Sequence, residues 1–150
     1  MYVDMSSDRQ FYLGVKALIT DPDGKILLLK SARRKPSDKW EPYWDLPGGK
    51  MQDLDIIGTL RREVREEIGV KKLEVENLLD VSVANFRINK GEGNLMFLIY
   101  LCSIPGNSRL KLSQEHSQFR WASRKEAAKC LEYMLPKDSL KRILNTGIIK

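Results

Sequence analysis

The chain has 150 residues, of which 42% are hydrophobic and 31% are charged, a balance typical of a globular protein with a buried core. This composition favours one domain over residues 1–150, with a flexible tail at residues 1–9, and no apolar run is long enough to span a membrane. The net charge of +6 favours polyanionic partners, but the basic residues are dispersed and form no evident stripe for nucleic acid.

The N-terminal sequence has no basic flank followed by an apolar run. We therefore expect a cytoplasmic protein.

The first segments in chain order predict a β-hairpin. The residues from Phe11 to Thr20 are rich in strand formers, Asp21-Pro22-Asp23-Gly24 is a strong turn signal, and Lys25 to Lys30 is a second apolar run. The basic residues 31–43 then predict a surface loop, because they include two prolines. A short strand of residues 44–47 follows.

A glycine-containing turn is predicted next, at Pro47-Gly48-Gly49-Lys50. Glycine permits left-handed backbone angles and a close approach of the main chain to a ligand.

The turn leads into an amphipathic helix that is predicted to end at a left-handed Gly69. Its apolar residues recur at three- and four-residue steps and form one stripe, which consists of Ile57, Leu60, Val64 and Ile68. On the other side, Glu63, Glu66 and Glu67 lie next to one another. Like charges at these spacings cost about 0.2–0.5 kcal/mol per pair, so the cluster requires open solvent or a cation. Magnesium prefers such oxygen ligands, and it can polarise a phosphoryl oxygen and activate water.

The segment from Trp44 to Val70 resembles the signature box of the Nudix hydrolases, G-x5-E-x7-R-E-U-x-E-E-x-G-U, where U is a bulky aliphatic residue. Gly49 matches the first glycine. The second half of the box is matched by Arg62, Glu63, Val64, Glu66, Glu67, Gly69 and Val70. The resemblance implies that the Gly48 carbonyl, Glu63, Glu66 and Glu67 hold the metal ions and that Arg62 orients the acidic cluster.

The box is one residue shorter than the family pattern. The family has thirteen positions between the first glycine and the arginine, whereas residues 50–61 supply twelve. Counting forward from Gly49 places Asp55 at the first glutamate of the box, and counting back from Arg62 places Leu54 there. Either Asp53 or Asp55 can cap the following helix. We interpret the difference as a shortened loop.

A second hairpin is predicted after the acidic helix. Residues 72–89 contain strand formers, the segment from Asn89 to Gly93 is a turn, and Leu95 to Ile104 is an apolar strand suited to the middle of a sheet. A short strand from Phe119 to Trp121 follows.

Two helices are predicted near the end of the sequence. Ser123 and Glu126 form a capping box that opens a helix to about Met134, and Pro136 suits the first turn of another helix to about Leu144. Strands mixed with separated helices predict an α/β fold, and the family resemblance implies the Nudix α/β/α sandwich with a mixed β-sheet.

The resemblance implies Mg²⁺-dependent hydrolysis, with Mn²⁺ as a substitute, of a diphosphate linkage in a nucleoside di- or triphosphate or a nucleoside diphosphate derivative. Clean-up of modified nucleotides is one such role. The candidate general bases are Glu66, Glu67 and Glu115, the last because many members carry an acidic residue before the strand that contains the tryptophan. Lys50 and Arg33 are candidates for contact with the phosphorylated substrate, although an exposed turn lysine and a solvated charge run are the alternatives.

The aromatic residues before the box, Trp40, Tyr43 and Trp44, allow two interpretations. They can stack on a base, or they can pack under the loop, which is the commoner role of large aromatics.

Two other functions stay open. A nucleotide-binding regulator without hydrolysis would explain the shortened box, and an RNA 5′-end pyrophosphohydrolase would suit the basic charge. We expect no membrane partner, and the protein is expected to be a monomer or a homodimer.

Overall fold

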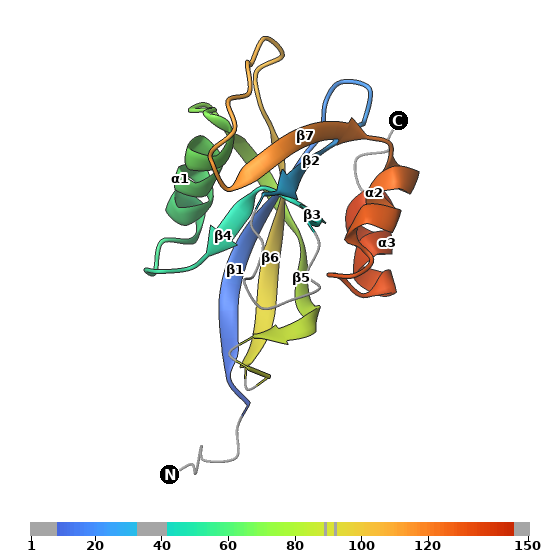
Figure 1. Cartoon of the computed structure of the whole chain (residues 1–150). Helices are drawn as coiled ribbons and strands as arrows, with labels where there is room; N and C mark the ends of the chain where they lie inside the picture. Colours follow the sequence, from blue (N-terminus) through green and yellow to red (C-terminus); the bar gives the residue numbers. More distant parts are fainter. Residues whose placement is uncertain (1–8, 33–41, 89, 92, 146–150) are drawn as a thin grey trace.

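The computed structural model describes residues 9–32, 42–88, 90–91 and 93–145 (Figure 1). The strands are β1 (Phe11–Ile19), β2 (Ile26–Ser31), β3 (Trp44–Asp45), β4 (Gly48–Lys50), β5 (Glu74–Ile88), β6 (Gly93–Ser103) and β7 (His116–Ala122), and the helices are α1 (Ile56–Ile68), α2 (Arg124–Leu131) and α3 (Lys137–Asn145). The predictions for the tail of residues 1–8, for Arg33 and for Trp40 lie outside the described residues. No described helix is long and apolar enough to cross a membrane.

The strands form two sheets between layers of helices. One sheet has the order β4-β1-β6-β5, with β1 parallel to β6 and the other pairs antiparallel, and the second has the antiparallel order β3-β2-β7. Figure 1 shows α1 on one side of the strands and α2 and α3 on the other. The prediction of an α/β sandwich with a mixed sheet is confirmed.

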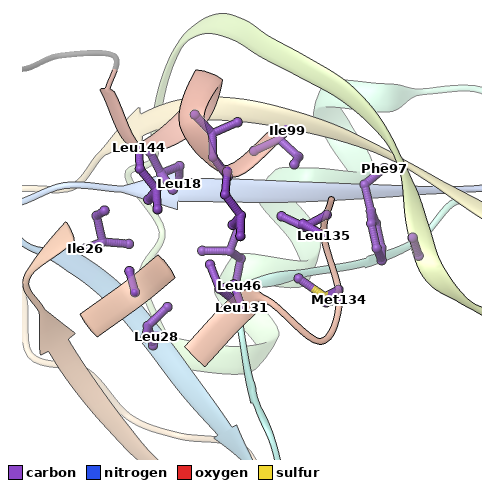
Figure 2. Close-up of a cluster of buried hydrophobic side chains, with 14 of the residues drawn as sticks. Leu18, Ile26, Leu28, Leu46, Phe97, Ile99, Leu131, Met134, Leu135 and Leu144 are labelled. Atoms are coloured by element: carbon purple, nitrogen blue, oxygen red, sulfur yellow. The ribbon is translucent and has the colours of Figure 1, made fainter. Parts of the chain in front are cut away.

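Two hydrophobic clusters hold these layers together. The first packs β1 and β2 against α2 and α3 through residues such as Leu18, Leu28 and Leu131 (Figure 2). The second packs the opposite faces of the same strands against Leu60 and Val64 of α1. Because helices cover both faces, β1 and β2 need apolar residues on both sides, which explains their nearly continuous apolar sequences.

The prediction of a hairpin between β1 and β2 is wrong. The turn itself forms, since the Gly24 N–H donates to the Asp21 carbonyl at 2.9 Å, but the only bridge beyond it among the described residues joins Thr20 and Ile26. β1 then pairs with β4 and β6, whereas β2 pairs with β3 and β7. Turn residues specify a chain reversal, but burial on both faces decides which strands pair.

The hairpin of β5 and β6 is confirmed, with β6 in the interior of its sheet. The capping box of Ser123 and Glu126 is confirmed as well, although α2 ends at Leu131 rather than near Met134. The predicted last helix is present as α3.

The predicted glycine turn is instead strand β4, which pairs antiparallel with Gly14, Val15 and Lys16 of β1. Gly48 has a φ of 146°, and a Cβ at this position would collide with the Val15 carbonyl oxygen. Glycine is therefore required for the close approach of two strands.

Helix α1 begins at the shortened loop and has well-defined ends. The Asp55 side chain accepts a hydrogen bond from the Gly58 N–H at 2.9 Å, and Gly69 is left-handed with a φ of 73°. Leu54 is 99% exposed and therefore contributes no packing. Of the two candidate caps, Asp55 is the N-cap, and it keeps α1 intact although the box is one residue short.

This geometry predicts that Asp55→Ala lowers the free energy of unfolding by about 1 kcal/mol, because a helix N–H loses its acceptor. The neighbouring substitution Leu54→Ala is the control and should change it by less than about 0.5 kcal/mol. Urea denaturation followed by circular dichroism measures both. Equal effects of the two substitutions would contradict the capping role.

Candidate functional site

The acidic face of α1 lies directly against β4. Glu67 Oε1 accepts a hydrogen bond of 2.7 Å from the Gly48 N–H. Glu63 lies so close to Gly49 that a Cβ there would collide with its carboxylate. Glycine is required at Gly48 by the backbone of β1, and the absence of a side chain at Gly49 leaves room for the Glu63 carboxylate against the main chain of β4.

The three glutamates differ in exposure, because α1 rotates them progressively away from β4. The side chain of Glu67 is 12% exposed, that of Glu63 is 23% exposed and that of Glu66 is 55% exposed. Arg62 lies within 3.8 Å of Glu66, one turn along the helix, and within 3.5 Å of Glu63. One guanidinium thus links two members of the cluster.

The cluster resists a full negative charge in the absence of a cation. Burial raises the pKa of Glu67 to about 8, with further increases from Asp45 and Glu63 and opposing effects of Lys16 and the Gly48 N–H. Burial and the neighbouring Glu66 also raise the pKa of Glu63. A bound cation would reverse both effects, because it favours the ionised carboxylates.

The available donors fit a hard metal ion. No three His, Cys, Asp or Glu side chains within the described ranges converge into a ready-made cage. Magnesium, however, commonly takes only one or two protein carboxylates and fills its other positions with water and substrate phosphate. Glu63, Glu67 and the adjoining main chain of β4 offer oxygen donors of that kind, and Glu66 lies beside them.

A buried ion pair, which the sequence analysis did not identify, lies next to this cluster. Lys16 of β1 is 6% exposed, and its Nζ donates to Asp45 Oδ2 at 2.8 Å and to the Leu46 carbonyl at 3.3 Å. Burial alone would lower the pKa of Lys16, but the carboxylates of Asp45 and Glu67 outweigh this effect and raise it. The sequence contained a signal for this ion pair, because Lys16 lies within an apolar strand and a buried charge requires a partner.

The only histidine of the sequence also lies at the site. His116 Nε2 is 3.9 Å from Glu67 Oε2, and its buried Nδ1 has no hydrogen-bond partner among the described residues. Burial lowers the pKa of His116, while that of Glu67 is raised. Near pH 7 and without a cation, this contact therefore joins two neutral groups.

The remaining candidates lie around the cluster. Glu115 is exposed on the segment before β7, and its charge is close enough to raise the pKa of Glu63. Lys50 is exposed at the end of β4 and lines a cavity together with Tyr43. Trp44 is half-buried against the first hydrophobic cluster, which agrees with the packing interpretation.

Comparisons with known proteins agree with this arrangement. A family model described as the NUDIX domain matches residues 11–143. Among solved structures, a MutT protein from Methanosarcina mazei is 25% identical with a TM-score of 0.71, and the match covers 91% of this chain and 95% of that chain. The Escherichia coli ORF135 protein is 27% identical with a TM-score of 0.63, covering 91% of this chain and 90% of that chain.

An ADP-ribose pyrophosphatase from Streptococcus suis has the same fold, at 20% identity and a TM-score of 0.66, with 93% of each chain covered. No curated protein sequence is significantly similar to the chain. The family match includes β1, β4 and α1, and hence the glycines, the buried lysine and the carboxylates described above. The chain therefore belongs to the NUDIX family and is a Nudix pyrophosphohydrolase, an enzyme that acts on acid anhydrides.

Proposed function

We propose that the protein hydrolyses a diphosphate linkage in a nucleoside di- or triphosphate, or in a related nucleotide derivative, with Mg²⁺ or Mn²⁺ as the cofactor. The observation that carries this proposal is the contact between the buried Glu67 carboxylate and the Gly48 N–H, beside Glu63. Similar folds include proteins named as an ADP-ribose pyrophosphatase and a dihydroneopterin triphosphate pyrophosphohydrolase.

Glu63, Glu66, Glu67 and the Gly48 carbonyl would hold the metal ions in this proposal. When bound, such an ion polarises a phosphoryl oxygen and lowers the pKa of a coordinated water. The protein contributes positioning and charge compensation, which dominate catalysis of phosphorus chemistry.

The side chains around the cluster have separate proposed tasks. Arg62 compensates and orients the carboxylates, as its ion pairs with Glu63 and Glu66 suggest. Lys50, exposed at the end of β4, is positioned to contact a phosphate. A general base is also needed, and the candidates are Glu66, Glu67 and Glu115.

The intact start of α1 favours hydrolysis over the regulatory alternative. The shortened box motivated a non-hydrolytic regulator, but Asp55 caps the helix and Gly48 still reaches Glu67. The missing residue is thus accommodated before the helix, and the spacing of the carboxylates is unchanged.

We predict that Glu67→Gln lowers kcat/KM by about 100-fold or more, because it removes a charge needed for metal binding and a candidate base. The assay follows products by mass spectrometry from a panel of nucleotides with Mg²⁺ and with Mn²⁺. Glu74→Gln is the matched control, since Glu74 is an exposed carboxylate at the start of β5. It should retain the parent's activity.

The same panel decides among the alternatives. Release of neither phosphate nor pyrophosphate from any substrate would refute the hydrolase proposal, and tight binding without turnover would support the regulator. A 5′-triphosphorylated RNA belongs in the panel. Preference for this RNA, together with a steep loss of binding with salt, would instead support the RNA 5′-end function.

A second prediction concerns the pH dependence of stability in the metal-free protein. Burial raises the folded-state pKa of Glu67 to about 8, above the ordinary value of 4.5 for a glutamate side chain. Between these values the folded state binds more protons than the unfolded state, so the free energy of unfolding falls as pH rises through this window. Glu67→Gln should weaken this fall.

Urea denaturation between pH 5 and pH 8 in the presence of a chelator measures the free energy of unfolding of the parent and of Glu67→Gln at each pH. Titrating groups that do not interact with Glu67 are common to both proteins and cancel in the comparison. Mg²⁺ should stabilise the parent more at pH 8 than at pH 6, because the metal binds ionised carboxylates. Parallel stability curves for parent and variant would contradict the buried, protonated state of Glu67.

A further inference from the structure

A cavity separate from the acidic cluster lies between β7 and the loop that follows β6. It has a volume of about 470 Å³, within the range of cavities that bind small ligands. Its walls come from residues 20–22 of the turn after β1, from the segment 104–110 and from two aromatic residues of β7. Figure 1 shows this turn and this loop at the same end of the molecule, beside β7. The described residues that line the cavity do not include Glu63, Glu66 or Glu67.

The two aromatic residues lie on the same face of β7. Phe119 lies opposite Leu29 of β2. Trp121 lies opposite Leu27, and both leucines belong to the second hydrophobic cluster. Because alternate residues of a strand share a face, the two rings are presented together. Trp121 packs against that cluster, whereas Phe119 is 43% exposed, so the cavity has an accessible ring on which a planar heterocycle can stack.

A second cavity adjoins the first. It has a volume of about 180 Å³ and is lined by residues 69–72, which follow α1, and by part of the same loop. Pro105, Ser108 and Arg109 line both cavities, and Ser108 Oγ holds this turn by donating to the Pro105 carbonyl at 2.6 Å. We call the two cavities together the accessory cleft, which is defined by residues 20–22, 69–72 and 104–110 with Phe119 and Trp121.

The accessory cleft carries an excess of positive charge. The charged residues that line it are Arg109, Lys71, Lys72 and Asp21. Within the described part of the chain, the side chains of the three basic residues form no hydrogen bond or ion pair. Asp21 Oδ1, in contrast, accepts hydrogen bonds of 2.9 Å and 2.8 Å from two main-chain N–H groups of its own turn. Unpartnered cations favour an anionic ligand, and a guanidinium group matches the geometry of a phosphate.

The nearby end of α1 is covered by hydrogen bonds. The C-terminal carbonyls of a helix carry partial negative charge, which disfavours an anion beside them. Here the Ile68 carbonyl accepts a hydrogen bond of 2.9 Å from the Lys111 N–H, and the Glu67 carbonyl accepts one of 3.0 Å from the Ser113 N–H. The segment that continues from the accessory cleft thus occupies these carbonyls, which weakens their repulsion of a phosphate.

We infer that the accessory cleft is a second nucleotide-binding site, in which Phe119 stacks on the base and Arg109 binds the phosphate. Both residues line the larger cavity, so one ligand can contact them together. The ligand class is a nucleoside monophosphate, which carries a planar ring and a phosphate on one small molecule. The site uses cations and rings rather than carboxylates, so it needs no metal and does not depend on the proposed hydrolysis.

Equilibrium dialysis with AMP, GMP, CMP and UMP in the presence of a chelator tests this site. At least one nucleotide should bind, and it should bind more tightly than its nucleoside or ribose 5-phosphate, each of which lacks part of the recognised structure. Phe119→Leu should weaken binding about tenfold because base stacking is lost. Arg109→Gln should also weaken it about tenfold, because a hydrogen bond between charged groups is lost.

Two substitutions elsewhere are the matched controls. Phe11→Leu removes an aromatic ring that is 44% exposed, at the end of β1 away from the accessory cleft. Lys141→Gln removes an exposed cation on α3, on the other side of the strands from α1 (Figure 1). Both variants should bind the nucleotide as tightly as the parent.

Hydrogen-exchange mass spectrometry locates the nucleotide on the unsubstituted protein. Slower exchange in residues 104–110 and in β7 supports the accessory cleft. Slower exchange only in β4 and α1 would place the nucleotide at the acidic cluster and overturn the inference, while the proposed hydrolysis would stand. The inference also fails if none of the four nucleotides binds, or if Phe119→Leu and Arg109→Gln both bind like the parent.

Discussion

The absence of side chains at Gly48 and Gly49 is the constraint on which the site depends. β4 lies between β1 and α1, and a Cβ at Gly48 would strike β1 while a Cβ at Gly49 would strike Glu63. This packing lets the Gly48 N–H reach Glu67 and fixes the helix against the strand. The positions of the carboxylates therefore follow from the main chain of β4, and the hydrophobic stripe of α1 holds the opposite face in the core.

Close packing at this point has an electrostatic consequence. Burial favours the neutral form of Glu67, yet Lys16 is buried nearby and stays charged because Asp45 pairs with it. Removing one partner of such a buried pair is costly, since the other charge is left without compensation. The ion pair also ties β1 to the segment just before β4 through the Leu46 carbonyl. The same side chains thus help to position the glycine strand.

The shortened box shows which part of the motif the fold can vary. One residue fewer before α1 changes the loop, where Leu54 is almost fully exposed and Asp55 takes the N-cap position. The carboxylates are spaced by the helix itself, so their mutual arrangement does not depend on loop length. Variation is therefore tolerated before the helix and would be damaging within it.

The sequence by itself determined the local features. The periodicity of Leu60, Val64 and Ile68 predicted α1 and its buried face, and Ser123 and Glu126 predicted the start of α2. The glycines and glutamates of the box identified the family. Each of these signals acts over only a few residues of the chain. Only the tertiary structure decided that β1 and β2 separate into different sheets and that Pro47 to Lys50 leads into a strand rather than forming a turn. It also decided that Lys16, Asp45 and His116 lie beside the acidic cluster. These outcomes depend on burial and pairing between segments far apart in sequence, and hydrophobic patterns within one segment do not specify which distant segment will cover it.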